Sequence, residues 1–331
     1  MNGFSKPSFT IEQQISLLRE RGLHIPDENR TKRYLSNIGY FRLSAYTRPF
    51  YQPNTSTHTF IENTAFDDIL RLYVFDRELR LLLLDAIERI EVALRAQLAN
   101  TLAEHYGPHG YLEPTIFDTR YKHDWLLEKL EYTGTQRDIE PFLLHYQHKY
   151  SSAPTQPPIW MAVELLSFKE VSTLLANLRN TKDTQRIEQH FGWKMPVLRS
   201  WFRSLSDLRN MCAHHSRVWN REFGSRPEIP KKVQTQWPII AHTLPSPFQN
   251  SPEQTISPQR RLYMFVVVMQ SLLNVVSPKS RWAERLIDLL DRYPNVSRWH
   301  MGFPEDWQSD PFWSRFATSP SKHKNTENSD A

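Results

Sequence analysis

A long helical pattern runs through residues 66–106. Apolar side chains recur there at helical spacing, at Leu70, Tyr73, Leu79, Leu83, Ile87, Ile90, Leu94, Leu98 and Leu102. That spacing places them on one side of an α-helix. A straight helix over this range would reach about 60 Å, at about 1.5 Å per residue. Because globular helices are usually much shorter, we expect a kink or a break into two pieces.

The composition agrees with a helical chain. Only nine of the 331 residues are glycine, whereas Leu, Arg and Glu are abundant. This balance favours helices over a doubly wound sheet. Further helical segments are predicted at residues 10–22, 29–37, 121–132, 139–150, 159–178, 183–191, 259–276 and 281–293. At least four of the helices are long enough to pack as a bundle, so we predict an all-α fold.

A second amphipathic stretch covers residues 198–223. On a helix, its apolar stripe holds Trp201, Leu205, Leu208, Cys212 and Trp219. The opposite side is polar and mostly cationic, with Asn210, His214, Arg217 and Arg221, and with Arg203 and Asp207 nearby. We therefore expect one helix as far as Phe223, with a buried face and a working outer face, stopped by Gly224 and Pro227.

Arg209 and His214, with four residues between them, have the side chains that metal-free RNA cleavage requires. The 2′-hydroxyl of RNA attacks the adjacent phosphorus, which needs a base for that hydroxyl and an acid for the leaving oxygen. A histidine can take either role near neutral pH. An arginine offers a forked, permanently charged donor to the phosphate oxygens. Asn210 is expected to orient either group.

The motif residues do not share one helical stripe. Asn210 and His214 are i,i+4 neighbours. Arg209 lies roughly 140° round the helix from His214, at about 100° per residue. Arg209 could curl toward the same groove, or it could serve a groove shared with a second subunit. The spacing leaves both arrangements open.

Three more residues are candidates for supporting roles near the motif. Glu91 and Arg95 form an i,i+4 pair of opposite charge. They are either a surface ion pair or a pair in which one member faces the groove of Arg209 and His214. His215 directly follows the motif and is expected to support it.

Four arginines are candidate RNA-binding residues: Arg42, Arg203, Arg217 and Arg221. The first lies among the aromatic side chains of residues 40–51. Interleaved aromatic and arginine side chains can stack on and neutralise single-stranded RNA. The alternative is that these rings pack the N-terminal region onto the main body, and both can hold for different residues.

Charge and cysteine content narrow the class of protein. The formal net charge of +5 favours a polyanionic partner, although a basic protein without such a partner also fits. With Cys212 as the single cysteine, the chain forms no internal disulfide, which suits a reducing compartment. Cys212 lies on the apolar stripe, so we interpret it as core packing and not as a nucleophile. No Cys/His metal spacing is present, and we expect no cofactor.

The most apolar run, residues 262–276, is interrupted by Gln270 and Asn274. It is too short for a confident membrane span and is predicted to be a buried helix. The N-terminus lacks the basic-then-apolar pattern of a secretory signal. We therefore expect a cytoplasmic protein without a membrane partner.

The chain carries an ordered set of short sequence words. They are residues 38–46 (IGYFRLSAY), 75–80 (FDRELR), 87–95 (IERIEVALR), 158–160 (PIW), 208–210 (LRN), 212–215 (CAHH) and 217–221 (RVWNR). This set resembles the abortive-infection proteins of the AbiD/AbiF type, an Abi-like family. That family is similar to the HEPN ribonuclease superfamily, whose enzymes carry an R-x4-6-H motif. The resemblance covers residues 6–221, with one departure at Lys169, where glycine is more usual after phenylalanine.

The resemblance implies an HEPN-like helical bundle, which we place at residues 61–224. A small N-terminal helical region is expected before it, at residues 1–60. A Pro-rich wrap and C-terminal helices are expected at residues 225–317. A tail rich in Ser, Lys, Asn and Asp, 318–331, is expected to be disordered.

The resemblance also implies a function. It points to a phage-defence endoribonuclease that cuts RNA without a metal, with His214 as acid or base and Arg209 as charge stabiliser. In this family the motifs of two subunits commonly face each other in one site. We therefore expect a homodimer that acts on RNA.

Two other functions fit the same residues. A non-catalytic RNA-binding module would keep the motif for contacts alone. A regulatory protein would hold an antitoxin or a small RNA as its partner. Cleavage of RNA by the wild-type chain distinguishes the enzyme from the module, and a stoichiometric co-purifying partner would favour the regulatory protein.

Overall fold

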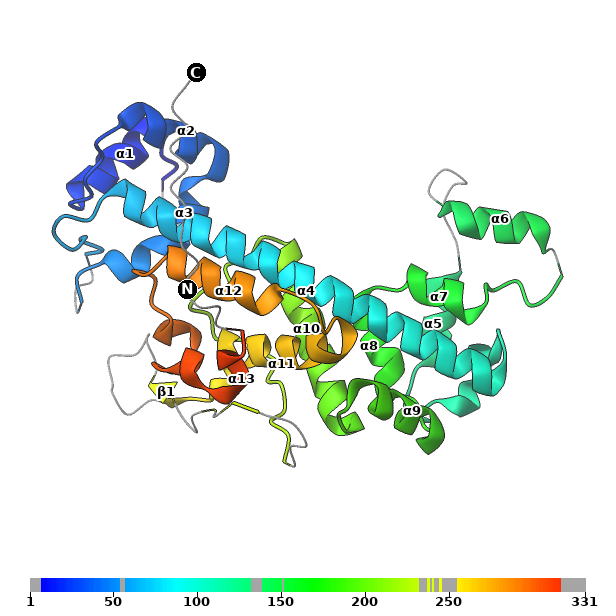
Figure 1. Ribbon diagram of the computed structural model, residues 1–331. Helices are drawn as coiled ribbons and strands as arrows, with labels where there is room; N and C mark the ends of the chain where they lie inside the picture. Colours follow the sequence, from blue (N-terminus) through cyan, green and yellow to red (C-terminus); the bar gives the residue numbers. More distant parts are fainter. Residues whose placement is uncertain are drawn as a thin grey trace, which may run out of the picture.

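Helices make up nearly all of the regular structure (Figure 1), which confirms the predicted all-α fold. The computed structural model describes residues 7–53, 57–131, 139–150, 152–231, 237–238, 240, 244–245 and 255–316. The described strands, β1 (Leu244–Pro245) and β2 (Thr255–Ile256), form an antiparallel pair of two residues each. The expected disordered tail, residues 318–331, lies outside the described residues.

The helix α4 (Phe66–Tyr106) is the central helix of the molecule and runs diagonally through it in Figure 1. It is one continuous helix of 41 residues, so the expected break is wrong. The helices that pack against it are α3 (Tyr40–Thr47), α7 (Ile159–Leu165), α8 (Phe168–Ala176), α9 (Thr181–Phe191), α10 (Met195–Ala213), α11 (Leu262–Val276) and α12 (Trp282–Arg292). No glycine or proline interrupts the range. Tertiary packing along its length therefore stabilises a helix that has no internal breaker.

Two short helices precede α3 at the N-terminal end. The first, α1 (Ile11–Glu20), begins with a capping box, in which Thr10 and Gln13 exchange hydrogen bonds. The second, α2 (Glu28–Ile38), matches the helix predicted at residues 29–37. Gly39 has a φ of 85°, a value that glycine adopts readily, and it makes the turn into α3. These three helices lie beside the start of α4 in Figure 1.

The segment expected as one helix at residues 159–178 is two helices, α7 and α8. Ser167 caps the second helix, because its hydroxyl accepts from the Glu170 N–H while the Glu170 side chain accepts from the Ser167 N–H. The capping box therefore starts a new helix within a stretch whose apolar residues had suggested a single one. The remaining helices of this half are α5 (His123–Leu130) and α6 (Pro141–Lys149).

The C-terminal helices share the core of α4. The predicted buried helix is α11, and most of its side chains are inaccessible to solvent. Trp282, the first residue of α12, donates from its indole N–H to the carbonyl of Leu82 in α4 at 2.8 Å. None of the described helices combines the length and the apolar character that crossing a membrane requires.

Short turns complete the described chain. They are the 3-10 helices η1 (Arg48–Phe50), η2 (Gly110–Leu112), η3 (Pro114–Ile116), η5 (Pro258–Arg260), η6 (Trp299–Met301) and η7 (Trp307–Ser309), and the helix α13 (Pro311–Ser314). The last three of these elements belong to an aromatic region, residues 299–316. The rings of Phe303, Trp307, Phe312 and Trp313 are buried, whereas Trp299 is exposed. The Trp313 indole N–H donates to Tyr263 Oη of α11 at 3.0 Å.

Candidate functional site

The predicted motif lies at the C-terminal end of α10. That helix ends at Ala213, so the expected continuation to Phe223 is wrong. Residues 214–223, which were predicted to continue the helix, form a loop instead. Among them, Trp219 is buried and Arg217 and Arg221 are half-buried.

A backbone cap ends the helix directly after the motif. His215 has a φ of 58°, in the left-handed region. Its N–H donates to the carbonyl of Cys212 at 3.0 Å, and the next N–H, of Ser216, donates to Met211 at 2.9 Å. These two bonds form a Schellman motif, which usually has glycine at the left-handed position. Because a histidine occupies this position, no glycine marks the end of the helix in the sequence.

A buried carboxylate fixes the loop that follows. Asp76 of α4 is fully buried, and its Oδ1 accepts from the backbone N–H groups of Val218 (3.1 Å) and Trp219 (2.7 Å). Tyr46 Oη donates to Asp76 Oδ2 at 2.6 Å, and Arg80 forms an ion pair with the same carboxylate. Burial raises the pKa of Asp76, while these donors act in the opposite direction. The loop is therefore anchored to the central helix.

Arginines from both sides of the loop add further bonds. Arg42 of α3 donates to the carbonyl of His215 at 2.8 Å. Arg217 donates to the carbonyl of Ala45 at 3.1 Å, and Arg221 donates to that of Arg217 at 3.3 Å. Three of the four predicted RNA-binding arginines thus hold the backbone around the motif, and an RNA contact by them stays a prediction.

Arg209 and His214 have different surroundings. His214 is exposed at the end of α10. Arg209 faces α4 and lines a hollow of about 510 Å³. The other residues that line this hollow are Leu81, Leu84, Asp85, Glu88, Glu91 and Val92. Asn210 is half-buried, and its Oδ1 accepts from Arg209 Nη1 at 3.4 Å. The hollow of Arg209 does not include His214, so one chain does not gather the two side chains there.

Glu91 and Arg95 form the predicted ion pair, but it is not a surface pair. Their side chains are only 12% and 10% exposed. Arg95 also donates to the carbonyl of Val163, which ties α4 to α7. Glu91 lines the hollow of Arg209, but His214 does not, so a groove shared by Arg209 and His214 stays a prediction.

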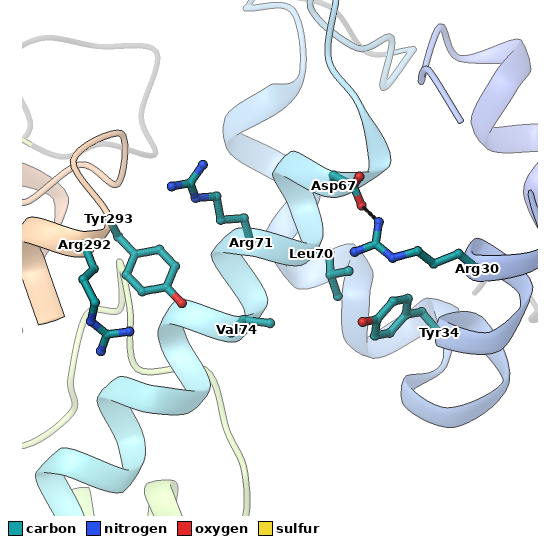
Figure 2. A pocket seen from close by; sticks show the side chains of 8 residues that line it. All are labelled: Arg30, Tyr34, Asp67, Leu70, Arg71, Val74, Arg292 and Tyr293. Atoms are coloured by element: carbon teal, nitrogen blue, oxygen red, sulfur yellow. Dashed lines mark hydrogen bonds and ion pairs between the residues drawn. The ribbon is translucent and has the colours of Figure 1, made fainter. Parts of the chain in front are cut away.

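A second hollow, of about 610 Å³, lies near the start of α4 (Figure 2). It is lined by Arg30, Tyr34, Asp67, Leu70, Arg71, Val74, Arg292 and Tyr293. Arg30 pairs with Asp67, and Arg292 pairs with a carboxylate of α4. Arg71 lies over the ring of Tyr293, 5.9 Å from its centroid. Two of its three arginines already have carboxylate partners on α4. We therefore interpret these side chains as contacts that hold α2 and α12 against α4, and not as a binding site.

The single cysteine packs in the core, as predicted. Cys212 is 2% exposed, and burial raises the pKa of its thiol to about 12. Within the described ranges, no group of three or more His, Cys, Asp or Glu side chains is placed to hold a metal ion.

A family comparison covers both helices that form the hollow of Arg209, α4 and α10. The family model for Abi-like protein matches residues 33–220, which include Arg209, Asn210, His214 and Asp76. No curated protein and no solved structure matches the chain. The family match spans more than half of the 331 residues. The chain therefore belongs to the Abi-like protein family, and this membership implies a role in abortive-infection defence against phage.

Proposed function

We propose that this protein is the endoribonuclease of an abortive-infection system and that it cuts RNA without a metal. The observation that carries the proposal is an exposed His214 held at a capped helix end, with Arg209 on the preceding turns. A histidine that transfers protons must reach its substrate, and this one lies on the surface of a backbone that is anchored on both sides. The family match, which includes both residues, supports the same function.

The reaction is a transesterification in which the RNA supplies its own nucleophile. A base takes the proton of the 2′-hydroxyl, the bond from O2′ to phosphorus forms, and the bond from phosphorus to O5′ breaks. An acid returns a proton to O5′, so one product ends in a cyclic phosphate and the other begins with a hydroxyl. His214 is the acid or base, Arg209 stabilises the phosphate charge, and Asn210 orients Arg209.

The proposed site draws on two chains. Cleavage needs His214 and the charge stabiliser Arg209 at the same phosphate, whereas the hollow of Arg209 does not include His214 of its own chain. Leu81 and Val92, which are 60% and 56% exposed, border that hollow. A second copy seated there would cover apolar surface and bring its own motif to Arg209. Glu91 and His215 support the site from its edges.

Cleavage assays on purified variants test the function. Wild type, Arg209→Ala and His214→Ala would be incubated with total bacterial RNA in EDTA, and the 3′ ends of the fragments would be analysed. We expect cyclic or 3′-phosphate ends from wild type. Loss of the histidine should lower the rate by about 10²–10⁴-fold, and loss of the arginine by about 10²–10³-fold.

The control is Arg77→Ala, which removes an exposed arginine of α4 and should leave cleavage unchanged. Equal cleavage by wild type, Arg209→Ala and His214→Ala would contradict the assignment and point to a contaminant or another site. Activity that disappears in EDTA and returns with a divalent metal would contradict the metal-free mechanism.

RNA binding without cleavage is the second candidate function. It is favoured by a cationic hollow between α8 and α10, which includes Arg203. In that case wild type and His214→Ala would bind RNA equally well, with affinity that falls as salt rises, and no fragments would form. An antitoxin or a small RNA that co-purifies in stoichiometric amount would instead favour the regulatory function.

A further inference from the structure

The largest of the hollows described here, of about 910 Å³, lies between α8, α10 and residues 224–226. Four cationic side chains from three segments converge on it: Lys169, Arg199, Arg203 and Arg226. Asp207 is the one carboxylate in the described lining, which also includes six hydroxyl side chains. This hollow differs from the one in Figure 2, where most arginines are paired.

The four cations of this hollow outnumber its one described carboxylate, Asp207. Within the part of the chain that the structure describes, none of the four forms an ion pair. Four like charges held close together repel one another unless an anion lies between them. The arrangement is therefore suited to an anionic ligand with more than one charge.

Buried polar atoms in the lining point to the same ligand. Arg199 Nε and Ser225 Oγ are buried and have no hydrogen-bonding partner among the described residues. Arg199 is nevertheless held in place, because its Nη2 donates to the carbonyl of Leu178 at 3.1 Å. A buried donor without a partner is unfavourable, and an anionic oxygen in the hollow would satisfy it.

The hollow shares a face of α10 with the proposed catalytic residue. Arg199, Arg203, Asn210 and His214 are spaced so that they lie along one side of the helix. The eleven positions from Arg203 to His214 correspond to about 16 Å along the axis, at about 1.5 Å per residue. At about 3.4 Å per phosphate in a stacked strand, this is the length of about five nucleotides.

The chemistry of the lining selects phosphates and not bases. None of the described lining residues is aromatic, so the hollow offers no ring on which a base could stack. Arginine, lysine and hydroxyl side chains are the usual partners of phosphate oxygens. A ligand held here is therefore recognised by its backbone, without regard to base sequence.

We propose that this hollow binds successive phosphates of an RNA strand whose scissile bond lies at His214. The proposal rests on the proposed function for the identity of the strand. It adds that α10 sets the path of the RNA, with Lys169, Arg203 and Arg226 as phosphate ligands and the half-buried Arg199 as a further donor. The nuclease would then tolerate many sequences on that side of the cut.

A binding assay tests this path without relying on cleavage. All proteins carry His214→Ala, so that a fluorescein-labelled single-stranded RNA of twelve nucleotides stays intact during anisotropy titrations. The double change Lys169→Ala/Arg203→Ala should weaken binding by about tenfold or more. The slope of log affinity against log salt should fall by about 1.4, since each lost phosphate contact contributes about 0.7.

Two matched variants separate this effect from charge loss and unfolding. Arg77→Ala/Lys279→Ala removes the same number of exposed cations elsewhere and should bind within about twofold of the parent. Lys169→Arg/Arg203→Lys keeps the charges of the hollow and should keep most of the affinity. Equal binding by the two double-alanine variants would overturn the proposal.

The source of the phosphates is tested by competition. Tripolyphosphate and ATP should displace the RNA only at concentrations far above that of an unlabelled oligonucleotide of the same length. If either displaces it at equal concentration, the hollow belongs to a free nucleotide and the strand path is wrong. If the wild type cuts no RNA but the variants bind as expected, the nuclease function is rejected and the RNA path stands. If the wild type cuts RNA but Lys169→Ala/Arg203→Ala binds as well as its parent, the RNA path is rejected and the nuclease function stands.

Discussion

Cys212 and His214 are two positions apart, yet their side chains meet opposite surroundings. The thiol packs into the core at 2% exposure, whereas the imidazole lies on the surface where the helix ends. Two positions turn a helix by about 200°, which accounts for the difference. The same geometry makes the histidine available for chemistry and removes the cysteine from it.

We predict that Cys212 resists alkylation in the folded protein. With a pKa of about 12, about one thiol in 10⁴ is ionised at pH 8, and the side chain is also shielded from the reagent. Iodoacetamide at pH 8 should leave the native chain unlabelled by mass spectrometry while labelling the urea-unfolded chain completely. Rapid labelling of the native chain would contradict the buried position and reopen a nucleophilic role.

For single residues, the sequence indicates which side chains have suitable chemistry, but it does not indicate the groups to which they hydrogen-bond. The residue types of Arg209 and His214 made them candidates, and the ordered set of family words strengthened the choice, while their catalytic roles stay a prediction. The role of Asp76 was missed, because the backbone N–H groups that it accepts from are 142 and 143 positions away. One signal was available, since Asp76 and Arg80 place opposite charges four residues apart within an apolar pattern.

At the scale of elements, periodicity located the helices but not all of their ends. The period of α10 continues into residues 214–223, and only the left-handed backbone at His215 shows that the helix has stopped. The division between α7 and α8 could have been predicted, because Ser167 and Glu170 have the spacing of a capping box. The continuity of α4 could not, because it depends on the helices packed around it.

We predict that Asp76→Asn destabilises the protein by about 3–5 kcal/mol, because it leaves the buried Arg80 without a counter-ion. The change also weakens the bonds that hold the backbone at Val218 and Trp219. Urea unfolding followed by circular dichroism would measure the loss.

Asp67→Asn is the matched control, because Asp67 belongs to an exposed ion pair, with a side chain that is 51% accessible. It should change the free energy of unfolding by less than about 1 kcal/mol. Similar losses for the two variants would show that the buried pair contributes no more than a surface pair, contrary to the anchoring role given to Asp76.

At the scale of the whole molecule, the proposed dimer can be tested through α4. Sedimentation at micromolar concentration should give the mass of two chains. Leu81→Asp places a charge on apolar surface that the second copy would cover, so it should give monomers and abolish cleavage. Val275→Asp changes another exposed aliphatic residue, on α11, and should leave both mass and activity unchanged.

A monomeric wild type that still cuts RNA would contradict the two-chain site. A dimer that survives Leu81→Asp with full activity would place the interface elsewhere on the molecule. Either result leaves the assignment of His214 and Arg209 to be judged by the cleavage assay itself.

The length of α4 has a consequence during synthesis. The helix leaves the ribosome well before α11 and α12, which begin at Leu262 and Trp282 and later cover it. The 156 positions between Tyr106 and Leu262 (262 − 106) take roughly 8–30 s to translate at about 5–20 residues per second. During that interval part of the apolar surface of α4 has no native cover, which makes the nascent chain a client for chaperones. The core around α4 is therefore completed only after α11 and α12 have been synthesised.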